Sequence, residues 1–258
     1  MFQAALFHGV PALGATALAL MALGGLLIGF SKTSFGGLGA VASAVYALSM
    51  PARESTAVVL LLLLTGDLIA LLSYGRHVRW RVLGQLLPAV LPGLLLGAVF
   101  IRLVDDVLMR RSIAVVLLAM VVVRLVQGRL RPATTPTEGR GHWAVAAGAG
   151  LTAGFTTMVA NAAAPVMSLY LLAQRFDKRR FLATNAWFFA TVNLCKVPFA
   201  ASVGLFTPLV FGVTLVMLPA VLVGAAVGRL IIRRVTQQQF ELVTVLATAA
   251  ASVLLLVR

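Results

Sequence analysis

The sequence predicts an all-α polytopic membrane protein built from two internally repeated halves, and three observations lead to that prediction. First, the 258 residues are 61% hydrophobic and 11% charged, whereas a soluble domain of this length needs far more polar surface. Second, apolar runs of the roughly 20 residues that cross a bilayer recur along the whole chain. Third, residues 218–233 nearly repeat residues 87–102.

The repeat is visible as two echoes. Residues 87–102 read LPAVLPGLLLGAVFIR and residues 218–233 read LPAVLVGAAVGRLIIR, with nine identities over sixteen positions. A weaker echo pairs GFS at 29–31 with GFT at 154–156. The offsets, 131 and 125 residues, are close, which indicates a duplicated half-molecule. Apolar chains with internal repeats and interrupted segments are typical of secondary transporters, whose substrate site lies between the halves.

Each half is expected to contain five apolar segments. In the N-terminal transmembrane repeat, residues 1–126, they cover 12–30, 36–50, 55–74, 82–101 and 108–126. In the C-terminal transmembrane repeat, residues 143–258, they cover 143–158, 162–174, 181–200, 209–232 and 240–257. Residues 127–142 are rich in Pro, Thr, Gly and Arg and form a polar linker loop between the repeats.

The second segment of each half is short. Segments 36–50 and 162–174 would cover about 20 Å at 1.5 Å per residue, less than the ~30 Å hydrocarbon core. Each follows a break, SKTSFGG in the first half and TTMVANAA in the second. Non-helical backbone at membrane depth is tolerated where it is buried in protein or lines a wet cavity. The two breaks are therefore the candidate binding site.

The basic residues predict the orientation. If all ten segments cross, the larger share of Lys and Arg falls on one side, which should be cytoplasmic, with both termini outside. That side holds Lys32, the loop of Arg76, Arg79 and Arg81, the linker, residues 175–180 and residues 233–234. Five spans per half make the repeats inverted, which we favour. If the two short segments only dip into the membrane, eight spans remain and the repeats become parallel.

Composition also excludes several classes of function. The formal charge of +14 would suit nucleic acid, but the basic residues stand in short clusters between apolar runs, so no nucleic-acid partner is expected. The single Cys195 excludes an internal disulfide and a cysteine metal site. The three histidines are scattered near segment ends. We therefore expect no metal, no cofactor and no catalytic residue.

Two stretches resemble the sulfite exporter TauE/SafE family, also called the toluenesulfonate uptake permeases. They begin GFSKTSFGGLGAVASAVYALSM in the first half and GFTTMVANAAAPVMSLYLLAQ in the second, and the resemblance covers nearly the entire chain. The family's glycine cluster after the first span is here FGGLG at 35–39, whereas its second-half counterpart is VANAAA at 159–164. The resemblance implies transport of sulfite or organosulfonates across the inner membrane.

The first break offers a cation and several donors. A sulfonate or sulfite carries three acceptor oxygens, so it needs positive charge together with N–H and O–H donors. A helix start after the break would add free N–H groups and a partial positive charge. The alternative is that the lysine snorkels to the interface. The candidate residues are Lys32, Ser31, Thr33, Ser34, Gly36 and Gly37.

The second half offers uncharged donors and a second lysine. Thr156, Thr157 and Asn161 occupy the matching break, where they could instead cap helix ends. Lys196 lies within an apolar segment, with Asn193 and Asn185 expected on the same helical face. Because a lysine at membrane depth costs a few kcal/mol and is rarely idle, we expect it to bind substrate.

Asp67 is the acidic residue deepest in an apolar segment. The 125-residue offset maps it to Val192, one turn from Lys196, so these two side chains could pair across the repeat axis. Asp67 is also the candidate carrier of a coupled proton, since acids within membrane spans mark proton relays. A static structural ion pair is the alternative.

Together these features predict a secondary transporter that moves a small anion, sulfite or an organosulfonate, by alternating access. The expected partners are the anionic substrate, the lipid bilayer and, for coupled transport, protons; a homodimer is left open. The alternatives are a transporter or channel for another solute, such as a carboxylate or a cation, and a membrane-embedded enzyme. The enzyme is not expected, because no pair of catalytic groups at fixed spacing is present.

Overall fold

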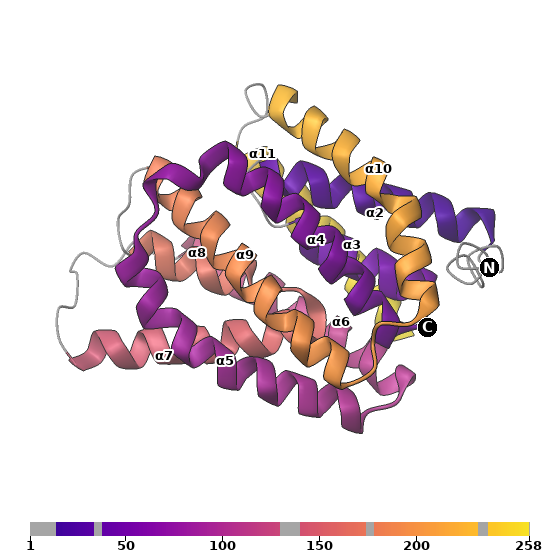
Figure 1. The fold of residues 1–258 in the computed structure, drawn as a ribbon, viewed down its shortest axis with the longest axis horizontal. Coiled ribbons are helices and arrows are strands. Elements are labelled where there is room, and N and C mark those ends of the chain that lie inside the picture. Colours follow the sequence, from indigo (N-terminus) through magenta and orange to yellow (C-terminus); the bar gives the residue numbers. More distant parts are fainter. Residues whose placement is uncertain (1–13, 34–37, 130–139, 174–177, 232–236, 258) are drawn as a thin grey trace.

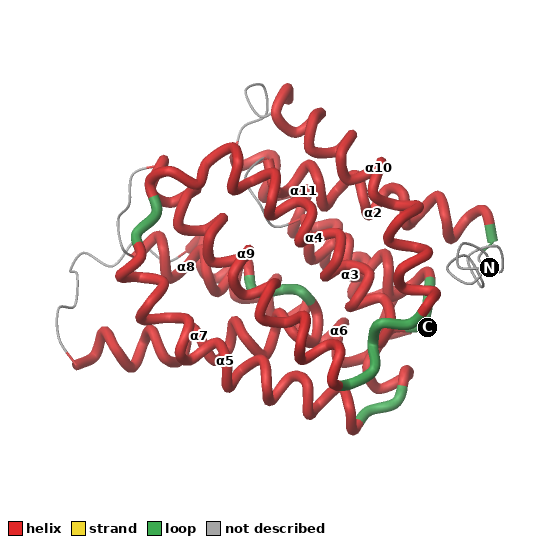
Figure 2. The backbone as a smooth tube through the Cα atoms, in the orientation of Figure 1, coloured by secondary structure: helices red, strands yellow, loops and turns green. Residues whose placement is uncertain are grey.

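The chain is helical throughout the part that the computed structural model describes, residues 14–33, 38–129, 140–173, 178–231 and 237–257. Within these ranges it forms ten α-helices and one short 3-10 helix, and they contain no strand (Figure 2). Four of the helices are long and apolar enough to cross a membrane. The predicted fold class, an all-α multi-pass membrane protein, is confirmed.

Each predicted apolar segment corresponds to one helix. The first half contains α2 (Ala15–Thr33), α3 (Leu38–Ser49), α4 (Ala52–Tyr74), η1 (Gly75–His77), α5 (Trp80–Leu103) and α6 (Asp106–Arg129). The second half contains α7 (Arg140–Ala160), α8 (Ala164–Ala173), α9 (Lys178–Ser202), α10 (Pro208–Ile231) and α11 (Gln237–Val257). The two short segments are α3, with 12 residues, and α8, with 10 residues.

Both interruptions are narrower than predicted. Ser31, Lys32 and Thr33 belong to the last turn of α2 instead of to the break. Thr156 and Thr157 likewise lie inside α7, and only residues 161–163 separate it from α8. The reason is that these Thr hydroxyls bond to carbonyls one turn earlier, Thr33 to Gly29 and Thr156 to Thr152, so they fit within a helix. Ser34, Gly36 and Gly37 lie outside the described residues.

The four helices that qualify as spans by length and composition are α2, α4, α5 and α10. Helix α9 is 25 residues long, but its interior holds Asn185, Asn193 and Lys196, which lower its apolar character. These polar side chains belong to the site described below, so the weaker membrane signal of α9 follows from its contribution to that site. How many of the ten segments cross the membrane stays a prediction.

The two sequence echoes pack against each other. Helix α5 packs along α7, and α10 packs along α2 (Figure 1). Gly29 of α2 lies against the backbone of α10 and Gly224 of α10 against that of α2, while Gly93 of α5 and Gly154 of α7 meet in the same way. A Cβ at any of these four positions would overlap the partner backbone. Small residues at such positions let helices pack closely in lipid.

Helix contacts occur in matched sets. If α2–α6 correspond in order to α7–α11, the contact of α2 with α10 corresponds to that of α7 with α5. The contact of α4 with α10 then corresponds to that of α9 with α5, and α3 with α11 to α8 with α6; all six contacts are present. This pattern supports the repeat, whereas the repeat limits and the inverted orientation stay predictions. Helices α4 and α9 pack against each other at the centre.

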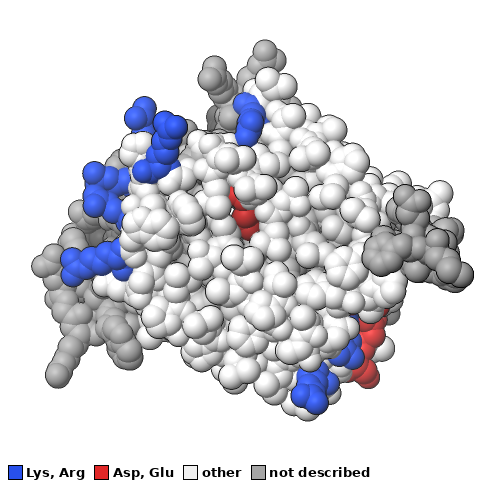
Figure 3. Space-filling model, in the orientation of Figure 1, with Lys and Arg blue, Asp and Glu red and all other residues white. Residues whose placement is uncertain are grey.

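Charge is distributed unequally between the two ends of the helices. What we call the basic end comprises η1, the starts of α5 and α9 and the end of α10. Its exposed arginines are Arg76, Arg79, Arg81, Arg179, Arg180 and Arg229, and the side chains described there include no acid. The opposite end combines Arg53, Arg102, Arg110 and Arg111 with Glu54, Asp105 and Asp106. Figure 3 shows blue atoms alone at the upper left and blue beside red at the lower right.

Candidate functional site

A cavity of about 130 Å³ lies between the two halves. Its walls come from α2, α3, α4 and α6 of the first half and from α7, α8, α9, α11 and the 161–163 break of the second. The volume suits a small ion with a few waters. The prediction that the site lies where the interrupted segments of the two halves meet agrees with this position.

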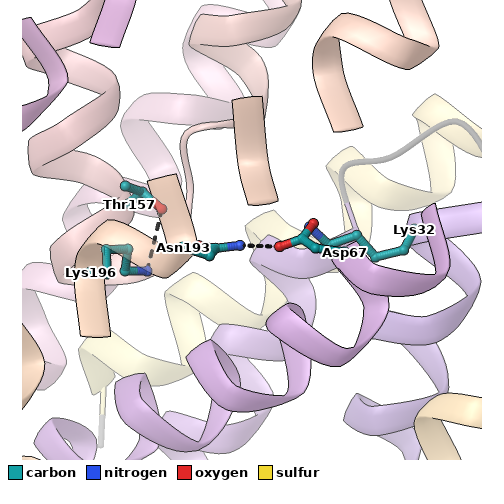
Figure 4. Close-up of polar contacts among 5 residues, drawn as sticks. All are labelled: Lys32, Asp67, Thr157, Asn193 and Lys196. Carbon is teal, nitrogen blue, oxygen red and sulfur yellow. Dashed lines mark hydrogen bonds and ion pairs between the residues drawn. The ribbon is translucent and has the colours of Figure 1, made fainter. Parts of the chain in front are cut away.

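In the first half, a buried ion pair faces the cavity. Lys32 of α2 donates to Asp67 Oδ1 of α4, and both residues line the cavity. Asp67 Oδ2 accepts a second hydrogen bond from Asn193 Nδ2 of α9, at 2.6 Å (Figure 4). The Asp67 side chain is 2% exposed and that of Lys32 13%. Both oxygens of the carboxylate are therefore used, one within its own half and one across the halves.

The sequence near Lys32 gives its long side chain a path to Asp67. Gly66 lies beside the lysine stem, and a Cβ at this position would stand 2.7 Å from Lys32 Cγ. The Lys32 ammonium also lies over the ring of Phe189, 4.9 Å from its centroid. Such a contact stabilises a cation in a poorly hydrated site. The Asp67 carboxylate and the Phe189 ring thus hold the Lys32 ammonium at the cavity, and Gly66 leaves space for the lysine stem.

In the second half, a buried lysine is bonded to neutral oxygens. Lys196 of α9 is 2% exposed and donates to Asn161 Oδ1. It also donates to Thr157 Oγ1 at 3.4 Å (Figure 4). Asn161 Nδ2 donates to the Thr56 carbonyl of α4 at 3.2 Å, so this amide bridges the halves. Its φ of 52° is left-handed, a conformation that asparagine tolerates better than most residues. This backbone turn is what ends α7 and redirects the chain into α8.

Most predicted site residues line the cavity. Those that do are Ser31, Lys32, Asp67, Thr157, Asn161, Asn185 and Asn193. Thr33 lies elsewhere, because its hydroxyl donates to the Ala225 carbonyl of α10 at 3.0 Å and joins α2 to α10. Thr156 also lies outside the lining, bonded to Thr152 within α7. These two threonines contribute to packing, and the prediction that they bind substrate is not supported by their positions.

The structure places Lys196 differently from the sequence expectation. Its side chain is absent from the cavity lining, although the helical period puts it on the same face as Asn185 and Asn193. Among the described residues it forms no ion pair with Asp67, whose two oxygens bond Lys32 and Asn193. Lys196 instead lies directly behind the cavity floor, in contact with two residues that line it.

Several lining residues escaped the sequence reasoning. Arg124 of α6 lines the cavity, as do Ser168 of α8 and Thr244 and Thr248 of α11. Arg124 could have been found, since it interrupts an otherwise apolar run, as Lys196 does. The hydroxyls gave no signal, because Ser and Thr are common in membrane helices and bond their own backbone. The cavity therefore holds two cationic side chains, Lys32 and Arg124, and one acid, Asp67.

The cavity approaches the basic end. Its lining residues are buried at depth, as for Asp67, Asn193 and Thr157, and half-buried near the starts of α9 and α11, as for Asn185 and Thr244. At the opposite end, α4 is held by other groups. Thr207 Oγ1 donates to Glu54 Oε1 at 2.9 Å, and the backbone N–H of Arg53 donates to Asp106 Oδ1 at 3.1 Å.

Two polar groups in the cavity are open to a ligand. The Ser31 hydroxyl and the Asn185 amide line the cavity and have no protein hydrogen-bond partner among the described residues. The Thr157 hydroxyl accepts from Lys196, so its own hydrogen is directed elsewhere. As for metals, the described residues include no group of three or more His, Cys, Asp or Glu side chains that could hold an ion. The site is thus a set of cations and donors around a small hollow.

Comparison with known proteins gives one match. The family model described as sulfite exporter TauE/SafE matches residues 21–255, nearly the whole chain. No curated protein and no solved structure matches the sequence.

Proposed function

Because the chain belongs to the sulfite exporter TauE/SafE family, we propose that it moves sulfite or an organosulfonate across the inner membrane by alternating access. The family is one of membrane transporters of sulfite or related anions, which agrees with the expectation that the chain is not an enzyme. The observation that carries the proposal is the cavity between the halves, which Lys32 and Arg124 line together with the Ser31 hydroxyl and the Asn185 amide.

The lining matches the chemistry of a sulfonate group. Three acceptor oxygens need donors and at least one positive charge, and an anion cannot itself donate. The Lys32 ammonium has three N–H donors, of which Asp67 takes one, and the Ser31 hydroxyl lies in the preceding position of α2. Charge-assisted hydrogen bonds of this kind are about twice as strong as neutral ones. The Asn185 amide adds a donor from α9.

The Lys32–Asp67 pair supplies a route to proton coupling. A proton that binds Asp67 removes the negative charge that holds Lys32, and the lysine is then free to bind the anion. An anion and a proton would thus occupy the site together. The membrane potential, negative inside, favours anion exit by roughly 2.3 kcal/mol per charge per 100 mV, so export needs no coupled ion and import does. Proton coupling is part of the proposal.

A flux assay in liposomes tests the function. Purified protein would be reconstituted and offered sulfite, sulfate, thiosulfate, sulfoacetate, isethionate and a short carboxylate, with empty liposomes as the control. We expect flux of sulfite or a sulfonate, reduced at least tenfold in Lys32→Ala. Flux of a carboxylate or a cation alone would contradict the proposal, as would unchanged sulfonate flux in Lys32→Ala.

Thr33→Val is the matched control. It lies next to Lys32, is 1% exposed and does not line the cavity. A general disturbance at the end of α2 would affect both variants, whereas loss of an anion-binding group would affect Lys32→Ala alone. Equal losses in the two variants would remove the support for Lys32 as a ligand.

A further inference from the structure

The basic end carries a second feature that the transport cavity does not use, an aromatic and arginine cluster at the junction of α4, η1 and α5. The rings of Trp80 and Trp187 lie 4.9 Å apart, and Trp187 Nε1 donates to the Gly75 carbonyl at 3.0 Å. The backbone N–H of Arg79 donates to Thr184 Oγ1 at 3.1 Å. These contacts with α9 fix the backbone of residues 75–80, so the arginines of this segment project from a rigid base.

The arginine side chains of this segment are exposed. Arg76, Arg79 and Arg81 stand around Trp80, which is itself 57% exposed. The Trp80 indole N–H has no acceptor among the described residues. An exposed tryptophan with an unpaired donor is typical of the membrane interface, where the ring lies at headgroup level.

An apolar surface continues from these charges. Leu68, Leu72 and Arg76 recur every four residues, so they follow one another along one face of α4 and η1. Leu68 is 60% exposed and Leu72 81%. Arg229 of α10 donates to Ser73 Oγ at 2.6 Å, which places a second guanidinium beside the last turn of α4. The neighbouring Leu230 is 75% exposed. The arginines at one level match the charged headgroup of a lipid, and the leucines below them match its acyl chains.

We propose that the surface formed by Leu68, Leu72, Arg76, Trp80, Arg229 and Leu230 binds an anionic phospholipid. Arg76 and Arg229 would bind the phosphate of the headgroup, since a guanidinium offers paired donors to phosphate oxygens. The Trp80 indole would donate at ester level, and the acyl chains would lie along the leucines. This site is separate from the cavity and does not depend on which substrate is carried.

The opposite end provides the contrast that makes the proposal specific. Its arginines stand among acids: Arg110 is paired with Asp106 at 3.6 Å, and Glu54 and Asp105 lie in the same region. At the basic end the described side chains include no acid to neutralise Arg76 or Arg229. Clusters of basic residues next to membrane helices attract anionic lipid with a strength that grows with each arginine.

Spin-labelled lipids test the site. The full chain would be reconstituted in phosphatidylcholine with trace spin-labelled phosphatidylglycerol or phosphatidylcholine, and the protein-bound fraction measured by electron paramagnetic resonance. We expect at least a fivefold preference for phosphatidylglycerol in the parent, reduced in Arg76→Gln and in Arg229→Gln and lost in the double variant. Arg102→Gln/Arg111→Gln at the opposite end is the matched control and should keep the parent preference.

Three results would overturn the proposal: no lipid preference in the parent, an unchanged preference in the double variant, or an equal loss in the control. Inorganic phosphate added at millimolar concentration distinguishes a lipid site from a site for free phosphate. The bound lipid should stay in place, and its full displacement would contradict a lipid site. Arg76→Lys, which keeps the charge, should retain most of the preference and serves where Arg76→Gln fails to reach the membrane.

Discussion

The two halves each use one lysine to join the end of their first helix to their third helix, but they place the charges differently. In the first half the lysine stands on α2 and bonds a carboxylate on α4. In the second half the lysine stands on α9 and bonds the neutral oxygens of Asn161 and Thr157. By the 125-residue offset, Lys32 corresponds to Thr157. Each half therefore links the end of its first helix to its third helix, but the donating lysine stands on the first helix in one half and on the third helix in the other.

This difference indicates separate roles. The first-half contact is an ion pair that lines the cavity, so a substrate anion can compete with Asp67 for Lys32. The second-half contact is made with two residues that line the cavity, and among the described residues Lys196 bonds these neutral oxygens instead of a carboxylate. Under the proposed function, the Lys32–Asp67 contact would be exchanged for a contact with the anion during transport, and the Lys196–Asn161 contact would persist. The predictions below separate these roles.

Removal of Lys32 should have the largest effect. Lys32→Met leaves Asp67 buried without its cation, and breaking a buried ion pair from one side costs about 3–5 kcal/mol. We expect a lower unfolding midpoint and at least a 100-fold loss of transport. The double variant Lys32→Met/Asp67→Leu should regain stability but not transport, as measured by thermal unfolding in detergent and by liposome flux. Recovery of flux in the double variant would show that Lys32 only neutralises the acid.

Removal of Lys196 should have a smaller effect on transport. Lys196→Met leaves Asn161 Oδ1 without a donor, which costs about 1–3 kcal/mol. Because Lys196 acts through Asn161, we expect the KM for the anion to rise about tenfold with little change in maximal rate. Asn161→Gly, which suits the left-handed backbone, should raise KM similarly.

The double variant Lys196→Met/Asn161→Gly decides whether the two residues act together. We expect it to be no worse than either single variant, as in other coupled pairs. Multiplied effects would instead identify Lys196 as an independent charge near the substrate. Thr156→Val is the control for this series, because its side chain neighbours Thr157 without reaching Lys196 or the cavity.

Asp67→Asn makes the first contact resemble the second, with a lysine bonded to a neutral amide. We expect downhill flux to change by only a few fold, because the amide oxygen still accepts from Lys32. The response to a pH gradient should disappear if Asp67 carries the proton. Uptake is measured with and without an imposed gradient in parent and variant. A gradient response that survives in Asp67→Asn would exclude Asp67 as the proton site.

Gly66→Ala should give the smallest effect. The added methyl group would stand 2.7 Å from Lys32 Cγ and 3.3 Å from Lys32 Cβ, so the base of the lysine stem must shift to accept it. We expect a two- to threefold rise in KM and no loss of folding. The equivalent position in the second half is Thr191, where no lysine stem approaches from α7, so Thr191→Ala should leave KM unchanged. A larger effect at Thr191 than at Gly66 would contradict this explanation.

The sequence predicted the helices better than their contacts. The ten apolar segments, two of them short, follow from hydropathy and from the breaks between runs, which are properties of single stretches of sequence. Asp67, Asn161 and Lys196 were found because polar side chains in apolar runs are conspicuous. Their partners were not found, because pairing depends on the rotation and crossing of helices. Lys196 illustrates this limit, because it shares a helical face with Asn185 and Asn193 and yet bonds Asn161 and Thr157 instead of lining the cavity.

Arg124 was missed for a different reason. It stands near the end of a segment, where an arginine ordinarily marks a loop, and only the packing of α6 beside α8 places it at the cavity. Thr33 is the converse case, a donor next to Lys32 that the close approach of α10 draws into helix packing.

The pairing of α2 with α10 has a consequence for biogenesis. At about 5–20 residues per second, a ribosome needs on the order of ten seconds or more to reach α10 after α2 has left it. During that interval the glycine-lined side of α2, built to touch another backbone, has only lipid or an insertion factor beside it. Helix α5, in contrast, meets α7 soon after its own synthesis. Helix α2, the first in the described part of the chain, is therefore among the last to find its partner, and defects in synthesis should expose it first.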